Sequence, residues 1–270
     1  MEILPGLVPL EDAESQKELG RAFKKRGIEA LVDTRFEDVK VTDEQVTATV
    51  TTKGKSRKIT AELLLVATGR GPVSAGLGYE EAGIKVDRGY VVPRSWETLE
   101  TDVPGVYAIG DILPPPSLAL AHASFAEGML VAELAAGLRS APIDYAGIPR
   151  VTYCTPEVAS VGLTEAQAKE QGHERGYEVK TSKFGFNNIA KGMIHGQGGM
   201  VKVVGAKDGP VLGVHMVGAR VTDLIAGAML VYNWEALPSE VAQFIHPHPT
   251  LSEAVGEAYM SLAGRPLHGS

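Results

Sequence analysis

The chain has 270 residues and a formal net charge of −7, with 22% charged and 44% hydrophobic residues. This length and composition are typical of about two globular domains, and the negative charge argues against nucleic acid as a partner. The sequence has no apolar run of membrane-spanning length and its acidic start is unlike a signal peptide, so we expect no membrane partner and a cytoplasmic protein.

The first part of the chain has the pattern of an α/β domain. A helix is predicted from Asp12 to Arg26, ended by Gly27. Strands are predicted at 28–32, 35–42, 45–52 and 61–67, with Lys53-Gly54-Lys55 as a hairpin turn.

Two predicted buried strands run into glycine. The first covers 63–67 and is followed by Gly69; the second covers 103–109 and is followed by Gly110 and Asp111. A glycine there admits a ligand close to the backbone, and an aspartate beyond it can accept hydrogen bonds from sugar hydroxyls. A largely buried helix is predicted over 117–138, and its N-terminal N–H groups would favour an anionic ligand.

The sequence contains a single cysteine, Cys154, so no disulfide can form within the chain. It ends a short apolar strand before Pro156, and we interpret it as a buried structural thiol. Any dithiol chemistry would need sulfurs from outside this sequence.

From about residue 148, short strands alternate with polar turns, which predicts a separate antiparallel α+β domain. Thr164 and Gln167 form a capping box for a helix at 165–171, and 187–199 is expected to be a surface loop. Strands are expected at 152–154, 158–161, 177–184, 200–204 and 211–217, and further helices at 221–233 and 238–244.

A His-Pro turn precedes the last predicted helix, 250–262. His248 would stand just before this helix and Glu253 one turn inside it, so the carboxylate could hold one ring nitrogen and leave the other to take a proton. A plain loop-to-helix junction is the alternative interpretation. A metal site at His246 and His248 is disfavoured because no further ligand has suitable spacing, and we expect no metal.

The motif His-Pro-Thr-Leu-Ser-Glu-Ala at 248–254 resembles the signature of dihydrolipoamide dehydrogenases, within the FAD-dependent pyridine nucleotide–disulfide oxidoreductases. The resemblance implies that His248 is the general base for a dithiol substrate and that Glu253 orients it. Glutathione reductases usually carry a second acidic residue where Ala254 stands, and mercuric reductases generally lack the histidine. Both fit less well.

Further motifs of the same family suggest where cofactors bind. Ala-Thr-Gly-Arg at 67–70 and Ala-Ile-Gly-Asp at 108–111 resemble its NAD-side and second FAD motifs. The resemblance implies these FAD-binding residues: Gly110, Asp111, Leu120, Ala121 and His122. It implies these NAD-binding residues: Glu2, Phe36 and Gly69.

The implied fold is an α/β nucleotide-binding remnant followed by an α+β interface domain. We expect a partial NAD-binding domain at 1–70, a returning FAD-binding segment at 71–145 and an interface domain at 146–270 that forms a homodimer. The sequence contains no Gly-x-Gly-x-x-Gly loop and no cysteine pair, so it resembles only the later part of the family. We expect FAD and NAD to bind only with the missing part, and the isolated chain to be inactive.

Intact members of this family oxidise dihydrolipoamide to lipoamide and pass electrons through a disulfide and FAD to NAD. The resemblance implies dihydrolipoamide, or the lipoyl domains of 2-oxo acid dehydrogenase complexes, as partners. A non-catalytic dimerisation or binding module is the alternative. The presence of Gly69, Asp111, His248 and Glu253 together favours the enzyme, because a pure interface module needs none of them.

Overall fold

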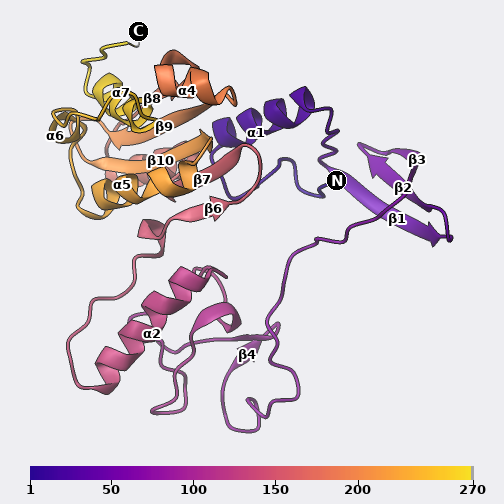
Figure 1. Cartoon of the computed structure of the whole chain (residues 1–270). Coiled ribbons are helices and arrows are strands. Elements are labelled where there is room, and N and C mark those ends of the chain that lie inside the picture. The colour runs from indigo at the N-terminus through magenta and orange to yellow at the C-terminus, as the bar shows by residue number, and fades with distance from the viewer. Residues whose placement is uncertain (269–270) are drawn as a thin grey trace. The chain divides into compact units, whose positions relative to one another are not determined.

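The computed structural model describes residues 1–268 and divides into two compact units (Figure 1). The first unit combines Met1–Leu65 with Pro149–Ser270, and the second is Val66–Ile148. The three-part division expected at 1–70, 71–145 and 146–270 stays a prediction.

A five-stranded antiparallel sheet forms the centre of the first unit, in the order β6-β7-β10-β9-β8. The Lys207–Gly209 turn joins β9 to β10, with Asp208 in the left-handed region at φ 57°. The strands agree with the expected ones to within a few residues and are β6 (Arg150–Thr152), β7 (Glu157–Gly162), β8 (Val179–Gly185), β9 (Gly199–Ala206) and β10 (Val211–Gly218).

Successive side chains along β9 and β10 point to opposite faces of the sheet, and most of them on both faces are apolar and buried. Both faces are therefore covered by helices. Helices α5 (Val221–Asn233) and α7 (Ser252–Leu262) pack on the face that carries Val201, Val203 and Met216. Helix α1 (Ala13–Lys25) packs on the other face, where Leu19 joins a core cluster with Val158, Met200 and Val217.

The remaining helices of this unit are α3 (Glu165–Arg175), which has the expected capping box, α4 (Ala190–His195), α6 (Pro238–Val241) and the short 3-10 helix η3 (Phe186–Asn188). The loop expected at 187–199 is therefore wrong, since it contains α4. Gly192 allows this helix because a Cβ there would lie 1.8 Å from the carbonyl oxygen of Phe186. Gly192 therefore does not end the helix. It allows the helix backbone to pack closely against Phe186.

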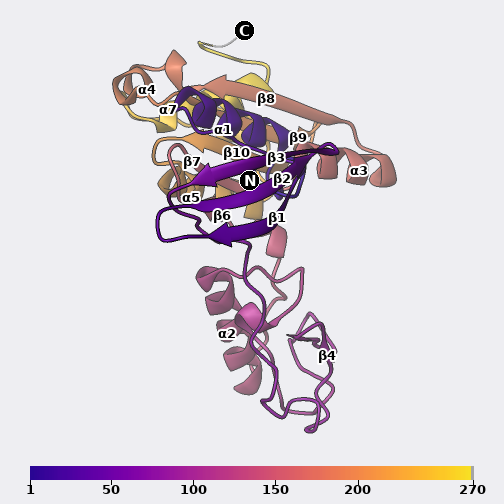
Figure 2. The same ribbon diagram turned by 90° about the vertical axis from the view of Figure 1, so that its right-hand side faces the viewer.

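A small antiparallel sheet follows α1 in sequence and consists of β1 (Thr34–Val41), β2 (Val46–Thr52) and β3 (Lys55–Ala61) (Figure 2). The expected hairpin turn joins β2 to β3, with Lys53 and Gly54 at φ 50° and 76°. Two positive φ angles in succession match the twist of the flanking strands.

The strands expected at 28–32 and 61–67 are wrong: 28–32 and 62–67 are irregular. A parallel strand is stable only between hydrogen-bonded neighbours, and the described chain supplies none at 62–67. Leu63 and Leu65 are accordingly 82% and 83% exposed. The segment 28–32 bonds to the end of α1, where the N–H of Ile28 donates to the carbonyl oxygen of Phe23, and to the chain start, where the N–H of Glu2 donates to the carbonyl oxygen of Leu31.

The second unit has little regular structure. It contains the hairpin β4 (Val86–Asp87) and β5 (Tyr90–Val91), helix α2 (Ala121–Ala135), and the 3-10 turns η1 (Gly110–Ile112) and η2 (Tyr145–Gly147). Its core joins α2 to the preceding segments through Leu99, Ala108, Leu113 and Leu130. The strand expected at 103–109 is wrong, because only an isolated bridge between Glu100 and Tyr107 forms there.

Candidate functional site

The imidazole of His248 and the carboxylate of Glu253 are in direct contact, with Nδ1 and Oε1 2.8 Å apart. His248 lies on the turn before α7, and its peptide bond to Pro249 is cis. Its side chain is 71% exposed, so the ring edge that carries Nε2 faces solvent while Nδ1 contacts the carboxylate. This arrangement favours the Nδ1–H tautomer and leaves the Nε2 lone pair able to accept a proton.

Glu253 is fixed at both carboxylate oxygens. Its Oε2 accepts the N–H of Thr250 at 2.9 Å, and the Thr250 hydroxyl donates to the carbonyl oxygen of Pro247 at 2.6 Å. Burial alone would raise the pKa of Glu253, but the hydrogen bonds from His248 and the Thr250 N–H outweigh it and lower that pKa. Glu253 therefore stays ionised and orients the imidazole.

His246 has a different environment from His248. Its ring packs against α7 at Gly256, where a Cβ would lie 2.4 Å from Cδ2 of His246. Burial lowers the pKa of His246, so the ring is neutral at neutral pH. Among residues 1–268, no group of three or more His, Cys, Asp or Glu side chains is arranged to hold a metal ion.

The residues predicted to bind FAD meet within the second unit. Gly110 has φ 78°, which brings Asp111 onto the surface of η1. One guanidinium nitrogen of Arg70 contacts both Asp111 Oδ2, at 3.2 Å, and the carbonyl oxygen of Ala119, at 3.1 Å. Arg70 thereby links Asp111 to the residues just before α2.

Helix α2 presents its N-terminus beside this aspartate. Leu120 is its N-cap residue, and Ala121 and His122 form the exposed start of the helix. Asp111 thus offers a hydroxyl acceptor and α2 offers backbone N–H donors, which together fit the ribityl chain and the O2 end of a flavin. The chain has no glycine-rich loop that fits the pyrophosphate.

The residues predicted to bind NAD do not fall in one unit. Glu2 and Phe36 belong to the first, and Gly69, with φ 101°, belongs to the second. The carbonyl oxygen of Glu2 accepts the N–H of Thr34, so the chain start lies beside β1, on which Phe36 is partly exposed. The Glu2 carboxylate accepts the N–H of Leu4 at 3.0 Å.

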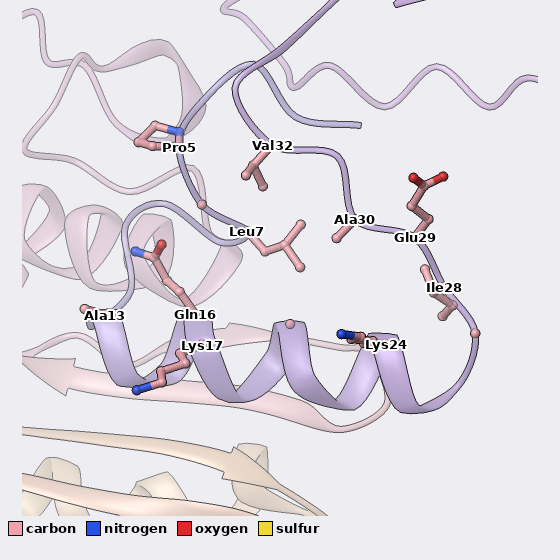
Figure 3. Close-up of a pocket in the computed structure, with 13 residues that line it drawn as sticks. Pro5, Leu7, Ala13, Gln16, Lys17, Lys24, Ile28, Glu29, Ala30 and Val32 are labelled. Atoms are coloured by element: carbon pink, nitrogen blue, oxygen red, sulfur yellow. The ribbon is translucent and has the colours of Figure 1, made fainter. Parts of the chain in front are cut away.

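A groove of about 730 Å³ lies between α1 and the irregular segment 28–32 (Figure 3). Leu7, Ile28 and Val32 supply apolar side chains, and Lys17 and Lys24 line it from the helix. None of the predicted site residues lines this groove. In the described part of the chain, no β-strand pairs with the extended segment 28–32, so the space between this segment and α1 stays open. An open groove of this kind is expected where the sheet of an α/β layer is incomplete.

Several buried ionic groups were not singled out by the sequence. Lys202 on β9 bonds to Asp12, at the start of α1, and to Glu165, at the start of α3. In the sequence, Lys202 is the single charged residue of the apolar strand Gly199–Ala206. A single charge in such a strand indicates a buried side chain that needs an ionic partner. Glu127 in the Ala-rich helix α2 and Glu257 in α7 are likewise buried carboxylates, although each helix also carries a second glutamate, Glu133 and Glu253.

Cys154 is partly buried, and its thiol lies 3.0 Å from the carbonyl oxygen of Pro156. Burial and the nearby Glu157 carboxylate raise its pKa. Both features are those of a structural thiol.

No helix among residues 1–268 is both long and apolar enough to cross a membrane.

Comparison with known proteins assigns both halves of the chain. A family model described as pyridine nucleotide-disulphide oxidoreductase matches residues 1–128, and the model for the dimerisation domain of the same family matches 148–259. A dihydrolipoyl dehydrogenase of Rhizobium etli is 40% identical over 272 residues, covering 99% of this chain and 55% of that protein. A dihydrolipoyl dehydrogenase of Bacillus subtilis is 39% identical, covering 97% and 54%. The chain thus spans about half the length of these curated relatives.

Solved structures of known proteins have a similar fold. LpdA from Mycobacterium tuberculosis superposes with a TM-score of 0.81 at 25% identity, covering 93% of this chain and 53% of that chain. The HOCl-induced flavoprotein disulfide reductase RclA from Escherichia coli gives 0.80 at 22% identity, with 95% and 57% covered, and shows the likeness of fold. Members of this family are oxidoreductases that use FAD and a pyridine nucleotide. With both halves matched by its models, the chain belongs to the pyridine nucleotide–disulphide oxidoreductase family.

Proposed function

We propose that this chain is the later part of a dihydrolipoamide dehydrogenase, which oxidises dihydrolipoamide to lipoamide and passes the electrons to NAD. The observation that supports this most directly is the contact of 2.8 Å between His248 and Glu253, on a turn that exposes the imidazole. Relatives that match along 97% to 99% of the chain are dihydrolipoyl dehydrogenases.

In this proposal His248 acts as the general base. Its Nε2 takes the proton of a substrate thiol, which makes the thiolate the nucleophile in disulfide exchange. Glu253 accepts Nδ1–H, holds the ring in the productive tautomer and stabilises the imidazolium once the proton has moved. The disulfide that the thiolate attacks must come from outside these residues, because Cys154 is the single cysteine.

The second unit carries the residues that we propose bind the flavin. Asp111 would accept hydrogen bonds from ribityl hydroxyls, and the N–H groups at the start of α2, from Ala121 onward, would face the flavin O2. Bound FAD supplies the acceptor for the two electrons of the dithiol and donates them to NAD as hydride. Glu2, Phe36 and Gly69 are proposed to contact NAD.

The proposed partners follow from the same assignment. The interface domain would form a homodimer, and dihydrolipoamide or a lipoyl domain of a 2-oxo acid dehydrogenase complex would deliver the dithiol. Phe244 and Ile245, which come directly before the His-Pro turn in sequence, are large exposed side chains and support an interface on this part of the first unit.

The experiment is the visible absorption spectrum of the purified chain, with its mass and oligomeric state measured on the same sample. A flavin band near one FAD per chain would mean that another polypeptide completes the nucleotide sites, and turnover with dihydrolipoamide and NAD is then measured for the wild type and His248→Ala. We expect His248→Ala to retain flavin and lose dithiol oxidation. Equal turnover in both would contradict the role of His248. A colourless dimer would mean an inactive, interface-bearing part of the enzyme.

A further inference from the structure

Glu127 is a fully buried carboxylate in the middle of α2, and it accepts hydrogen bonds from three different segments. Its Oε2 accepts the N–H of Gly110 at 2.6 Å. Its Oε1 accepts the hydroxyl of Ser117 at 2.6 Å and that of Tyr145 at 3.0 Å. The Gly110 N–H can only donate, so Oε2 of Glu127 is held as an acceptor, and both hydroxyls lie within hydrogen-bond distance of Oε1.

Two of these donors are themselves held in place. The Tyr145 ring packs edge-on against Trp96, with centroids 5.9 Å apart and planes at 90°. Burial and the adjacent Glu127 carboxylate raise the pKa of Tyr145, so its hydroxyl keeps its proton. Gly110 is fixed at φ 78°, and a Cβ there would meet the Ser124 hydroxyl on α2 at 3.3 Å. The Gly110 turn therefore lies directly against the helix that carries Glu127.

We propose that Glu127 is a positioning residue for the flavin site, holding the Gly110–Asp111 turn at a fixed place relative to the N-terminus of α2. Gly110 immediately precedes Asp111, and α2 begins at Ala121, within two turns of Glu127. A single carboxylate thus fixes both the acceptor for the ribityl hydroxyls and the helix that supplies backbone donors. This inference rests on the proposed flavin role of Asp111.

The side-chain chemistry makes the proposal testable by two substitutions of similar size. In Glu127→Gln, the amide oxygen can accept from the Gly110 N–H, while the NH₂ group donates to the Ser117 and Tyr145 hydroxyls, since hydroxyls also accept. Glu127→Leu keeps the volume and removes every acceptor, which leaves the Gly110 N–H buried without a partner. A positioning role predicts that Gln rescues the site and Leu does not.

The experiment observes the amide of Gly110 in the ligand-free chain. Residues 109 and 110 form the one Ile-Gly step in the sequence, so carbonyl-¹³C isoleucine with ¹⁵N glycine gives a single resolved signal for Gly110. We expect a downfield, exchange-protected amide proton in the wild type and in Glu127→Gln. In Glu127→Leu we expect an upfield shift and protection reduced at least about tenfold, because the amide no longer has a fixed partner.

Glu133→Leu is the matched control, because Glu133 is exposed on the same helix. The other glycine amides in the same ¹⁵N spectrum, which include those of β7 and β10, report whether the interface sheet stays folded in each variant. An unchanged Gly110 signal in Glu127→Leu would overturn the proposal. The proposal would also be overturned if the Gly110 amide lost as much exchange protection in Glu127→Gln as in Glu127→Leu, because the negative charge and not the hydrogen-bond acceptor would then matter.

A second arm separates this inference from the flavin assignment. In the flavin-loaded form, completed by a polypeptide that supplies the glycine-rich loop, Asp111→Asn is expected to weaken FAD binding about tenfold while leaving the Gly110 signal intact. Glu127→Leu is expected to weaken binding to a similar degree with that signal lost. Undiminished binding in Asp111→Asn contradicts the proposed function. Undiminished binding in Glu127→Leu alone, with weakened binding in Asp111→Asn, contradicts the positioning role.

Discussion

The ammonium group of Lys202 lies 2.8 Å from Oδ1 of Asp12, although the two residues are far apart in the sequence and the Lys202 side chain is only 5% exposed. Asp12 is also the N-cap of α1, where its Oδ1 accepts the N–H of Glu14. A buried ion pair therefore joins the start of α1 to the face of the sheet opposite α5 and α7. Glu165 completes the pairing of Lys202, with Oε2 2.6 Å from Nζ.

The first prediction concerns this pair. Lys202→Met should lower the free energy of unfolding by about 3 kcal/mol, because it leaves the Asp12 carboxylate buried without its cation. Lys207→Met is the matched control, since Lys207 pairs with Glu178 at an exposed position and its loss should change stability far less than the loss of Lys202. Urea denaturation at pH 7 measures both. Equal effects would show that the buried pair contributes no more than a surface pair.

The second prediction is a pH dependence caused by His215. Burial lowers the pKa of this fully buried imidazole, whose Nε2 contacts the carbonyl oxygen of Leu163 at 2.9 Å. With a lowered folded-state pKa, the unfolded chain binds the proton more readily, so stability falls as the pH drops below the unfolded value of about 6.5 and levels off below the folded value.

His215→Gln should flatten this part of the curve, because glutamine can donate to Leu163 and does not titrate. The free energy of unfolding is measured between pH 7.5 and 5 for both proteins, and His173→Gln, an exposed histidine on α3, is the control. An identical slope in the wild type and His215→Gln would sink the assignment.

The third prediction concerns the tautomer of His248. Since Glu253 accepts from Nδ1, the neutral ring should be mainly the Nδ1–H form, and Glu253→Ala should shift it toward Nε2–H, the form preferred by an imidazole in water. Imidazole ¹⁵N chemical shifts at pH 8.5 report the tautomer directly in the isolated chain. Glu257→Ala, one turn further along α7, serves as the comparison and should leave the His248 tautomer unchanged.

How far the sequence predicted this structure depends on whether an element is complete within the chain. The strands from Arg150 onward and the helices α3, α5 and α7 follow from alternation and capping, because their neighbours belong to the same unit, and the contact of His248 with Glu253 follows from the turn and the helix spacing. Helix α4 was missed because its glycine-containing stretch predicts a loop. The strand expected at 61–67 failed for the opposite reason. Its apolar run predicts a buried parallel strand, but residues 1–268 supply no neighbouring strand to accept its hydrogen bonds.

Buried charges mark a second limit. Lys202, Glu127 and Glu257 each interrupt an apolar element, which signals an unusual environment, but their partners lie on segments distant in sequence. The spacing of residues along the sequence predicts contacts within one helix or turn, but not contacts between distant segments. The partners of these charges could therefore be identified only in the folded structure.

The fourth prediction concerns the segment from Leu63 to Gly69, which has no backbone hydrogen bonds within the described part of the chain. Leu63 and Leu65 are exposed, so a protease can bind the segment in extended form without unfolding either unit. Brief digestion with thermolysin should cut first between 62 and 66, as identified by mass spectrometry. The comparable apolar residues of β2, such as Val50, are protected by strand pairing and should survive. First cuts within β2 would contradict this description.

The last prediction concerns Leu267 and His268, which Glu257 holds against α7. This carboxylate is 3% exposed and accepts Nδ1 of His268 at 2.7 Å, together with the backbone N–H groups of Leu267 and His268. Truncation after Pro266 removes all these donors and should lower the free energy of unfolding by about 2 kcal/mol, because the carboxylate stays buried without partners. His268→Ala keeps the backbone donors and should cost less.

A double substitution decides whether the lost partners are the cause. If the unpaired carboxylate is what destabilises the truncated chain, Glu257→Leu should recover stability in that background while destabilising the full-length chain, so the two effects have opposite signs. Urea denaturation of the four proteins gives the coupling free energy directly. Additive effects would mean that residues 267 and 268 stabilise α7 through apolar contact alone, with no contribution from the buried carboxylate.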